Sequence, residues 1–192
     1  MNDICTAKNE LRKKYLEQRK TLDAKYRADA ESRALLNLVS TKEFFLADKL
    51  FLYYPIKSEA DPLPFLEIAR SQGKKVAFPK CNKEDLSMKF FEISSHDDFS
   101  LGAYNIPEPK DELCELKADE KTLCIVPALL YSKDGHRLGY GKGFYDRFLA
   151  NFEGISAGFT YDAFVVDGLP HDAFDRKLDM IITEKGVYYS GR

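Results

Sequence analysis

The chain has 192 residues, 44% of them hydrophobic, and its 29 Lys and Arg against 31 Asp and Glu give a formal net charge of −2. This length and composition suit one folded domain over residues 1–192 and exclude wholesale disorder. The balance of charge argues against a nucleic-acid coat protein and against a polybasic membrane binder, although it leaves room for a local basic patch.

The spacing of the cysteines and the first residues of the chain indicate the cellular compartment in which the protein is expected. Cys5, Cys81, Cys114 and Cys124 are far apart and form no CxxC pair, which predicts a reducing compartment and neither a zinc site nor a disulfide framework. The first residues lack the apolar segment of a secretory signal, and no apolar run approaches the ~20 residues of a membrane span. We therefore expect a cytoplasmic protein. Because the sequence contains no zipper or exposed apolar repeat, we also expect a monomer.

Helices are predicted in the N-terminal part of the chain. Thr6 is expected to cap a first helix in which apolar residues recur among basic ones. A second helix is predicted over residues 23–38, where apolar side chains recur at helical spacing. Thr41 is expected to cap a short third helix that has Glu43 in its first turn.

Strands and helices then alternate. Strands are predicted at residues 49–54, 75–78 (ended by Pro79), 86–93, 122–130, 155–159 and 179–183, and helices at residues 62–72 (stopped by Gly73) and 143–152. The polar segment 94–121 is predicted to be mainly a long surface connection. This alternation indicates an α/β fold with parallel βαβ units beside N-terminal helices, and the apolarity of residues 122–130 suggests that they form a central strand.

Residues 134–146 carry the chemistry that we predict for this chain. After the apolar strand, this segment contains Gly135, Gly139, Gly141 and Gly143, with Arg137 and Lys142 among them. Glycine lets the backbone approach a ligand closely, and successive N–H groups with nearby cations form a cradle for phosphate oxygens. In an open α/β sheet, such loops lie beyond the carboxyl ends of the strands, where ligands bind. A carboxylate beside polyphosphate, here Asp146, usually implies Mg²⁺.

A simpler alternative is that these glycines only form tight turns. Three glycines at alternate positions, Gly139, Gly141 and Gly143, with cations between them exceed ordinary turn chemistry. The loop has neither the Gly-x-x-x-x-Gly-Lys-Ser/Thr order of a P-loop nor the Gly-x-Gly-x-x-Gly spacing of dinucleotide folds. The sequence therefore predicts a phosphate site of a different kind.

Several motifs in order make the chain similar to one enzyme family. Arg137-Leu-Gly-Tyr-Gly-Lys-Gly-Phe-Tyr-Asp146 resembles the signature of the 5-formyltetrahydrofolate cyclo-ligases, also called 5,10-methenyltetrahydrofolate synthetases. Further resemblances lie at Lys8-Asn-Glu-Leu-Arg12, Tyr53-Tyr-Pro-Ile-Lys-Ser-Glu59, Val76-Ala-Phe-Pro79, Met88-Lys-Phe90 and Leu178-Asp-Met-Ile-Ile-Thr-Glu184, so that they cover nearly the whole chain.

The resemblance implies a fold and an activity. Members of this family have a three-layer, doubly wound α/β fold with a mostly parallel sheet. They convert 5-formyltetrahydrofolate, with or without a polyglutamate tail, to 5,10-methenyltetrahydrofolate while ATP becomes ADP and phosphate in the presence of Mg²⁺. Phosphorylation of the formyl oxygen would activate the formyl carbon for ring closure, so the protein mainly has to align the reactants and neutralise charge.

The resemblance also implies roles for single residues. Arg137 and Lys142 are the expected catalytic residues, and Lys142 would stabilise the transferring phosphoryl group. The expected ATP contacts are Lys8, Arg12, Arg137, Leu138, Gly139, Tyr140, Gly141, Lys142, Gly143, Phe144 and Tyr145. The expected folate contacts are Tyr54, Glu59, Met88 and Tyr145, with Phe90 as a further candidate; Met88 and Phe90 are the weaker of these, because core packing is their default interpretation, and it is an alternative for Tyr54 too. Asp146 and Asp179 would hold Mg²⁺ directly or through water, and a plain strand-edge carboxylate is an open alternative for Asp179. His171 and Asp172 receive no role.

Departures from the family pattern and competing functions accompany this prediction. Phe144-Tyr145-Asp146 stands where many relatives have Tyr-Tyr-Asp, and Ala60-Asp61-Pro62 replaces the usual Val-Asp-Thr. One alternative is a non-catalytic reservoir for folate or nucleotide, which would not need the metal ligands. Another is a different phosphate-ester enzyme on a similar scaffold, because fold alone does not determine function. A nucleic-acid partner is the poorest interpretation, since acids balance the basic residues.

Overall fold

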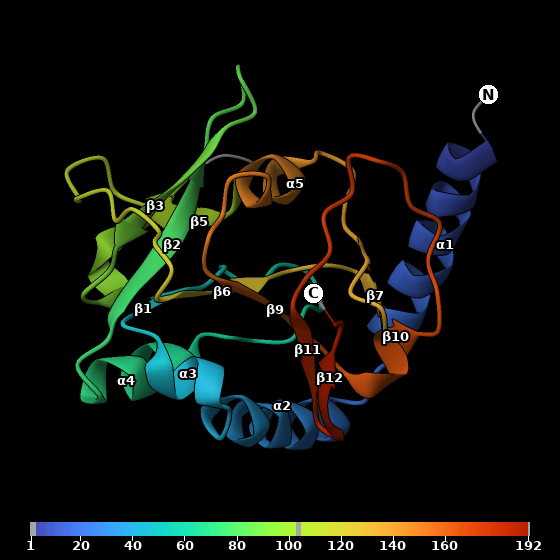
Figure 1. Cartoon of the computed structure of the whole chain (residues 1–192), viewed down its shortest axis with the longest axis horizontal. Coiled ribbons are helices and arrows are strands. Elements are labelled where there is room, and N and C mark those ends of the chain that lie inside the picture. The colour runs from blue at the N-terminus through green and yellow to red at the C-terminus, as the bar shows by residue number, and fades with distance from the viewer. Residues whose placement is uncertain (1–2, 103–104, 192) are drawn as a thin grey trace.

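A seven-stranded sheet forms the centre of the structure, a computed structural model that describes residues 3–102 and 105–191 (Figure 1). The strand order is β12-β11-β9-β6-β1-β2-β3. The strands are β1 (Lys49–Phe51), β2 (Lys75–Cys81), β3 (Met88–Glu92), β6 (Thr122–Val126), β9 (Ile155–Phe159), β11 (Met180–Thr183) and β12 (Gly186–Tyr189). The five inner strands pair in parallel, and only the edge strands β3 and β12 run antiparallel to their neighbours. As its apolar sequence suggested, β6 stands in the middle.

Helices cover both faces of this sheet. They are α1 (Asp3–Lys20), α2 (Ala24–Val39), α3 (Lys42–Leu46), α4 (Pro64–Ser71) and α5 (Phe144–Leu149). In Figure 1, α2, α3 and α4 lie below the sheet, α5 lies above it, and α1 stands at one end. The predicted fold class, a three-layer α/β fold with a mostly parallel sheet and N-terminal helices, is confirmed.

Two separate hydrophobic clusters explain why both faces are covered. Leu50, Leu123 and Ile125 belong to the cluster that includes α2, α3 and α4, whereas Phe51 and Cys124 belong to the cluster that includes α5. Successive side chains of a strand point to opposite faces of its sheet. A parallel sheet that is buried on both sides therefore needs strands that are apolar at consecutive positions, as β6 is.

Side-chain caps begin two of the helices, and the one at Thr41 was predicted. The carboxylate of Asp23 accepts a hydrogen bond from the Tyr26 N–H (3.0 Å), and the Thr41 hydroxyl accepts one from the Phe44 N–H (3.1 Å). Both contacts satisfy N–H groups that have no partner within the helix. The prediction that Thr6 caps the first helix is wrong, because α1 already includes Asp3 and Thr6 lies inside it.

Most other predicted elements occur within a few residues of their expected bounds. The strand predicted at residues 155–159 coincides with β9. The other strands are shorter than predicted: β1 lies within 49–54, β3 within 86–93 and β11 within 179–183. The helices are shorter too, with α4 inside 62–72 and α5 inside 143–152. The strand predicted at 122–130 is wrong at its far end, because β6 stops at Val126 before Pro127. The chain then enters β7 (Leu130–Ser132), which forms a second sheet with β8 (Arg137–Leu138) and β10 (Val165–Val166).

Pro79 does not end the second strand, contrary to the prediction. The Leu52 N–H donates to the Ala77 carbonyl, so Ala77 faces β1, and two residues later Pro79 faces the same way. By then β1 has ended at Phe51. The missing N–H of Pro79 therefore costs no ladder hydrogen bond, and β2 continues to Cys81 beside β3.

The connection at residues 94–121 contains more structure than we predicted. A short 3₁₀ helix, His96–Asp98, leads into a hairpin of β4 (Phe99–Leu101) and β5 (Pro107–Pro109). Residues 103 and 104 lie outside the described part of the chain. Backbone hydrogen bonds from Glu92 to Cys114 and from Leu116 to Phe90 then attach the segment to β3. The hairpin buries the side chain of Glu108.

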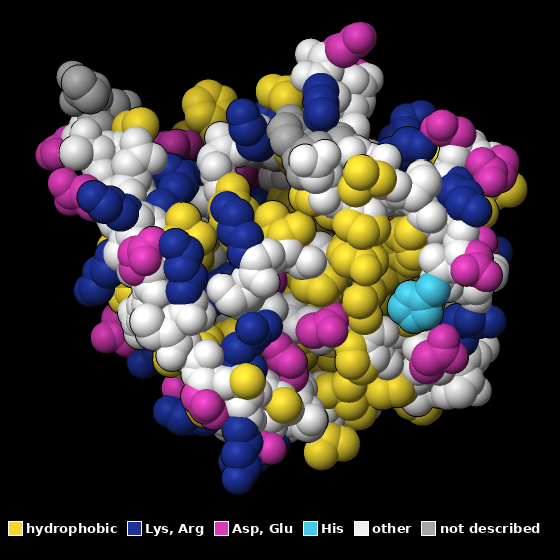
Figure 2. Space-filling model, turned by 180° about the vertical axis from the view of Figure 1, so that it is seen from behind, with side chains coloured by type: hydrophobic (Ala, Val, Ile, Leu, Met, Phe, Trp, Pro, Cys, Tyr) yellow, Lys and Arg dark blue, Asp and Glu magenta, His cyan; other side chains and the backbone are white. Residues whose placement is uncertain are grey.

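The surface shows both signs of charge beside an apolar band. Figure 2 shows a face on which hydrophobic side chains form a band, with Lys and Arg side chains interspersed with Asp and Glu on the left of it. No helix within residues 3–102 and 105–191 has the length and apolar character that a membrane span requires.

Candidate functional site

A cavity of about 1100 Å³ opens beyond the carboxyl ends of the parallel strands. Its lining comes from the segments after β1 and β6, the end of β2, the glycine loop (residues 134–146), α1, residues 172–176 and the β4–β5 hairpin. Ligand sites of open α/β sheets lie at this edge. Single small-molecule pockets are commonly about 300–1,000 Å³, so this cavity of about 1100 Å³ is at the upper end of that range.

The glycine loop reaches the cavity in a conformation that requires glycine. Gly141 has φ +91°, and Gly143, which precedes the first residue of α5, has φ +69°. L-residues rarely adopt such values. A Cβ atom on Gly141 would lie 3.3 Å from Arg12 Nη2, and one on Gly143 would lie 3.0 Å from Arg147 Nη1. The glycines therefore allow guanidinium groups to pack directly on the loop, which the turn-only alternative does not explain.

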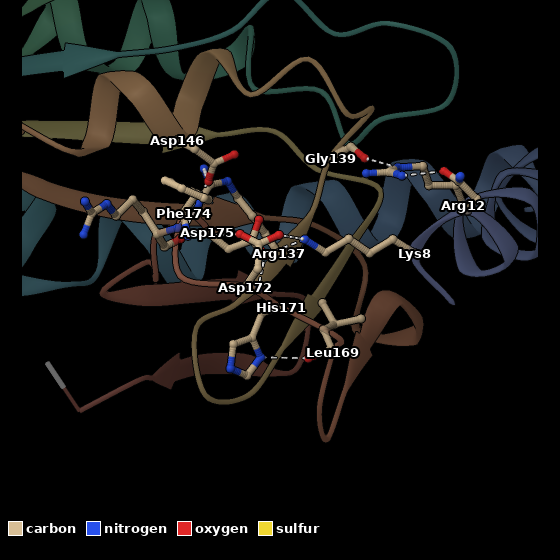
Figure 3. A network of polar contacts seen from close by, with 12 residues as sticks. Lys8, Arg12, Arg137, Gly139, Asp146, Leu169, His171, Asp172, Phe174 and Asp175 are labelled. Atoms are coloured by element: carbon tan, nitrogen blue, oxygen red, sulfur yellow. Dashed lines mark hydrogen bonds and ion pairs between the residues drawn. The ribbon is translucent and has the colours of Figure 1, made fainter. Parts of the chain in front are cut away.

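The first helix adds two cations to the same cavity. Lys8 and Arg12 lie four residues apart in α1 and both line the cavity. Lys8 Nζ contacts carboxylate oxygens of Asp172 (3.0 Å) and Asp175 (2.5 Å), and Arg12 Nε donates to the Gly139 carbonyl (2.9 Å). Figure 3 shows these side chains reaching from α1 to segments far away in the sequence. The contacts attach α1 both to the glycine loop and to residues 172–175.

Arg137 and Asp146 form an ion pair in the wall of the cavity. Arg137 Nη2 lies 2.7 Å from Asp146 Oδ1, and the same oxygen accepts a hydrogen bond from the Arg176 N–H (3.2 Å). Arg137 also donates to the Arg176 carbonyl. Its side chain is only 5% exposed, so the pair is largely shielded from water and salt. Lys142, in contrast, is exposed at the cavity and presents its charge to solvent.

Glu59 lies at the inner end of the cavity. Its side chain is buried, and one oxygen accepts a hydrogen bond from the Ile56 N–H (3.0 Å). Burial raises the pKa of Glu59 to about 7, although the Ile56 N–H, the charge of Arg19 and the nearby Tyr140 hydroxyl act in the opposite direction. A carboxylate held in this way can accept hydrogen bonds from a ligand, and near neutral pH it is close to its titration midpoint.

Of the other residues predicted to contact folate, three line the cavity and one belongs to the hydrophobic core. Tyr54, Tyr145 and Met88 line the cavity, as the sequence prediction required for folate contacts. The Tyr145 hydroxyl is buried and has no hydrogen-bond partner among the described residues, and a ligand could supply one. Phe90 does not line the cavity; it stacks on Phe51 at 4.3 Å between ring centroids and belongs to the core.

Asp179, the second predicted metal ligand, lies away from the cavity. It precedes β11, at the amino end of the parallel strands, and its carboxylate accepts hydrogen bonds from the Ser156 N–H (2.8 Å) and hydroxyl (2.7 Å). It is not among the residues that line the cavity. Within the described residues, no three His, Cys, Asp or Glu side chains gather as a metal site. Of the two predicted metal ligands, Asp146 lines the cavity beside the glycine loop and Asp179 does not.

Sequence reasoning missed the segment that closes the cavity behind Lys8. Asp172, to which we gave no role, and Asp175 both pair with Lys8, and the largely exposed Phe174 stands between them at the cavity wall. His171 stacks on His136 at 3.7 Å between ring centroids, which fixes the segment against the glycine loop. The sequence did contain local signals of this segment, namely Pro170, His171 and two aspartates three residues apart. The pairing of these aspartates with Lys8 could not be predicted, because Asp172 lies 164 residues further along the chain.

Comparisons with known proteins agree with this arrangement. The model of the 5-formyltetrahydrofolate cyclo-ligase family matches residues 4–184. The 5-formyltetrahydrofolate cyclo-ligase of Escherichia coli is 23% identical over 177 residues, which cover 90% of this chain and 97% of that protein. A solved structure of Aquifex aeolicus 5,10-methenyltetrahydrofolate synthetase superimposes with a TM-score of 0.84 at 33% identity, covering 96% of this chain and 93% of the other. The Mycoplasma pneumoniae synthetase gives 0.73 at 25% identity, covering 92% and 98%.

Proposed function

The chain belongs to the 5-formyltetrahydrofolate cyclo-ligase family, and we propose that it converts 5-formyltetrahydrofolate to 5,10-methenyltetrahydrofolate with ATP as the phosphoryl donor. One observation carries the proposal: a single cavity contains both a glycine loop surrounded by cations and a buried carboxylate. The first suits a polyphosphate and the second suits the N–H groups of a pterin ring. Neither a reservoir nor an unrelated phosphate-ester enzyme needs both together.

The phosphate end of the cavity would hold ATP. Lys8, Arg12 and Lys142 approach it from two sides, and the loop backbone at Gly139 to Gly143 lies between them. In this proposal Lys142 contacts the transferring phosphoryl group, because its charge is exposed and not already paired with Asp146, as that of Arg137 is. Lys8 would exchange at least one of its aspartate partners for a phosphate oxygen as ATP enters.

The residues present also fit a magnesium ion. Mg²⁺ prefers oxygen ligands and is commonly held by one or two carboxylates together with substrate phosphates. Asp146 supplies such an oxygen at the phosphate loop, and its side chain is 30% exposed and so accessible. The ion would neutralise charge on the phosphates, while Arg137 keeps the Asp146 carboxylate in position.

The folate end of the cavity would orient the substrate for ring closure. Glu59 accepts hydrogen bonds from the pterin, and Tyr54, Met88 and Tyr145 pack around the ring. The formyl oxygen then attacks the terminal phosphorus of ATP and ADP leaves. N10 next attacks the activated formyl carbon and gives up its proton to the departing phosphate or to solvent, and phosphate leaves with the former formyl oxygen to give the methenyl product. The protein contributes alignment, charge neutralisation and exclusion of water, and no covalent enzyme nucleophile is needed.

The test is a direct assay. Purified protein is mixed with 5-formyltetrahydrofolate, ATP and Mg²⁺, and the near-ultraviolet absorbance of the methenyl product is followed. We expect the band to grow only when ATP is present, and Lys142→Ala to lower turnover by about 10²-fold or more with unchanged thermal unfolding. Lys20→Ala is the matched control, since Lys20 is exposed on α1 and does not line the cavity.

Two results would contradict the proposal. If no product forms although a titration shows that 5-formyltetrahydrofolate binds, the reservoir function is the better interpretation. If no product forms and 5-formyltetrahydrofolate does not bind, the site serves another phosphate compound. A fully active Lys142→Ala variant would leave the reaction in place but remove Lys142 from its catalytic role.

A further inference from the structure

A buried cation lies behind the folate end of the cavity. Arg19, in the last turn of α1, is 1% exposed and is the only buried Lys or Arg among residues 3–102 and 105–191. It does not line the cavity. Removing a guanidinium from water is costly unless its charge and its N–H groups find partners inside the protein. The burial of the Arg19 guanidinium therefore needs a physical explanation.

The contacts of Arg19 fix one wall of the cavity. Its Nη2 donates to the carbonyls of Ala128 (3.1 Å) and Leu129 (2.6 Å), which directly follow the cavity residue Pro127. Its guanidinium carbon lies 4.8 Å from the ring centroid of Phe164. Nε and Nη1 are buried and have no hydrogen-bond partner among the described residues. Carbonyls and a ring face offer only partial charges, so they do not fully neutralise the guanidinium.

The opposite charge lies across the wall. Glu59 and Glu108 are the only buried carboxylates within the described part of the chain, and Glu59 is in the field of Arg19. The Arg19 charge opposes the rise in pKa that burial causes at Glu59, and it acts in the same sense on the neighbouring hydroxyl of Tyr140. No ion pair joins Arg19 to a carboxylate among the described residues. Its influence on Glu59 therefore acts through the low-dielectric interior.

We propose that Arg19 is a positioning residue for the folate end of the cavity. It holds the turn after β6 and supplies the buried positive charge that keeps Glu59 able to ionise near neutral pH. An ionised Glu59 can accept hydrogen bonds from a substrate, whereas a protonated one accepts fewer. This inference rests on the proposed function, because the charge of Glu59 matters for activity only if Glu59 contacts the substrate.

None of the other groups that act on Glu59 supplies a buried positive charge. The groups that act on its charge or titrate beside it are Lys57 and Tyr53 from its own segment, Tyr131 from β7, Tyr140 from the glycine loop and Tyr145 from α5. Burial raises the pKa of each of these tyrosines, so they stay neutral around pH 7. Lys57 is exposed and therefore screened by solvent. Arg19 is thus the buried cation whose charge acts on Glu59.

The first experiment measures Glu59 without any substrate. Carbon NMR of the Glu side-chain carboxyl groups is recorded against pH for the unmodified protein, Arg19→Met, Arg19→Gln and Arg19→Lys, with Glu59→Gln to assign the signal. We expect both neutral variants to raise the Glu59 pKa by about one unit and Arg19→Lys to keep it near the original value. Arg19→Gln retains donors for the two carbonyls and serves if Arg19→Met does not fold. An unchanged Glu59 titration in the neutral variants would overturn the inference.

The second experiment links the charge to binding. The affinity for 5-formyltetrahydrofolate is measured against pH without ATP. It should rise as Glu59 ionises, and in the neutral variants this rise should move to higher pH, weakening binding about 5-fold at pH 7. Arg33→Met, an exposed change on α2, should shift neither curve. If the NMR titration moves as expected but even the unmodified protein binds no folate, the role of Arg19 stands while the proposed function fails.

Discussion

Replacing the buried carboxylate, Glu59→Gln, should make the protein more stable at alkaline pH while impairing its function. Gln has nearly the same shape and keeps an oxygen that can accept the Ile56 hydrogen bond. It removes only the ability to ionise. Because Glu59 is buried and its pKa rises from 4.5 to about 7 on folding, its charged form destabilises the folded state.

The pKa shift determines both the sign and the size of the effect. Between pH 4.5 and 7, Glu59 holds a proton in the folded protein that it has released in the unfolded chain. The free energy of unfolding therefore falls as pH rises through this window. One pKa unit corresponds to about 1.4 kcal/mol, so ionised Glu59 costs about 3 kcal/mol above pH 7, of which about 1 kcal/mol is already present at pH 5.

Urea unfolding at pH 5 and pH 8 measures this cost. We expect the free energy of unfolding of Glu59→Gln to exceed that of the unmodified protein by about 2 kcal/mol more at pH 8 than at pH 5. Glu67→Gln is the matched control, because that glutamate is 73% exposed on α4. A stability difference that is the same at both pH values would refute the reasoning. The same variant should bind 5-formyltetrahydrofolate weakly, which would show that the destabilising charge is retained for function.

Three further predictions concern the phosphate end and the core. Lys8→Met should raise KM for ATP about 10-fold and change kcat less, as steady-state kinetics would show; an unchanged KM would contradict a phosphate contact. Asp146→Asn should abolish the Mg²⁺ dependence of ATP binding in a calorimetric titration without unfolding the protein, and a retained dependence would exclude it as a ligand. Gly158→Ala places a Cβ 2.5 Å from a Tyr131 ring carbon and should lower the free energy of unfolding by ~2 kcal/mol or more, whereas Gly168→Ala meets no neighbour and should not.

Local chemistry explains which elements could be predicted from the sequence. Asp23 and Thr41 begin helices because each side chain accepts a hydrogen bond from an N–H three residues ahead. The strand at residues 155–159 was predicted with its observed bounds, since a glycine turn precedes it and its own residues are apolar. Signals of this kind act within a few residues and do not depend on the rest of the fold.

Elements that depend on distant neighbours could not be predicted in the same way. From the sequence alone, Pro79 predicts the end of a strand. It removes no hydrogen bond from the sheet only because β1 has already ended beside it. The β4–β5 hairpin is polar and proline-rich, and its attachment to β3 through Cys114 and Leu116 has no local signal. Strand β12, which we did not predict, is stabilised by its pairing with β11 at the edge of the sheet.

The sequence by itself determined the α/β class, the glycine loop and the family resemblance, because strand apolarity, glycine spacing and motif order are properties of short segments. It also assigned Lys8, Arg12 and Glu59 to a ligand site, and the structure brings all three to one cavity. Only the tertiary structure decided which charges meet. The packing of α1 pairs Lys8 with Asp172 and buries Arg19, while the register of β9 and β11 directs Asp179 to Ser156. Electrostatic contacts act through space, so residues far apart in the chain find their partners only after the fold is complete.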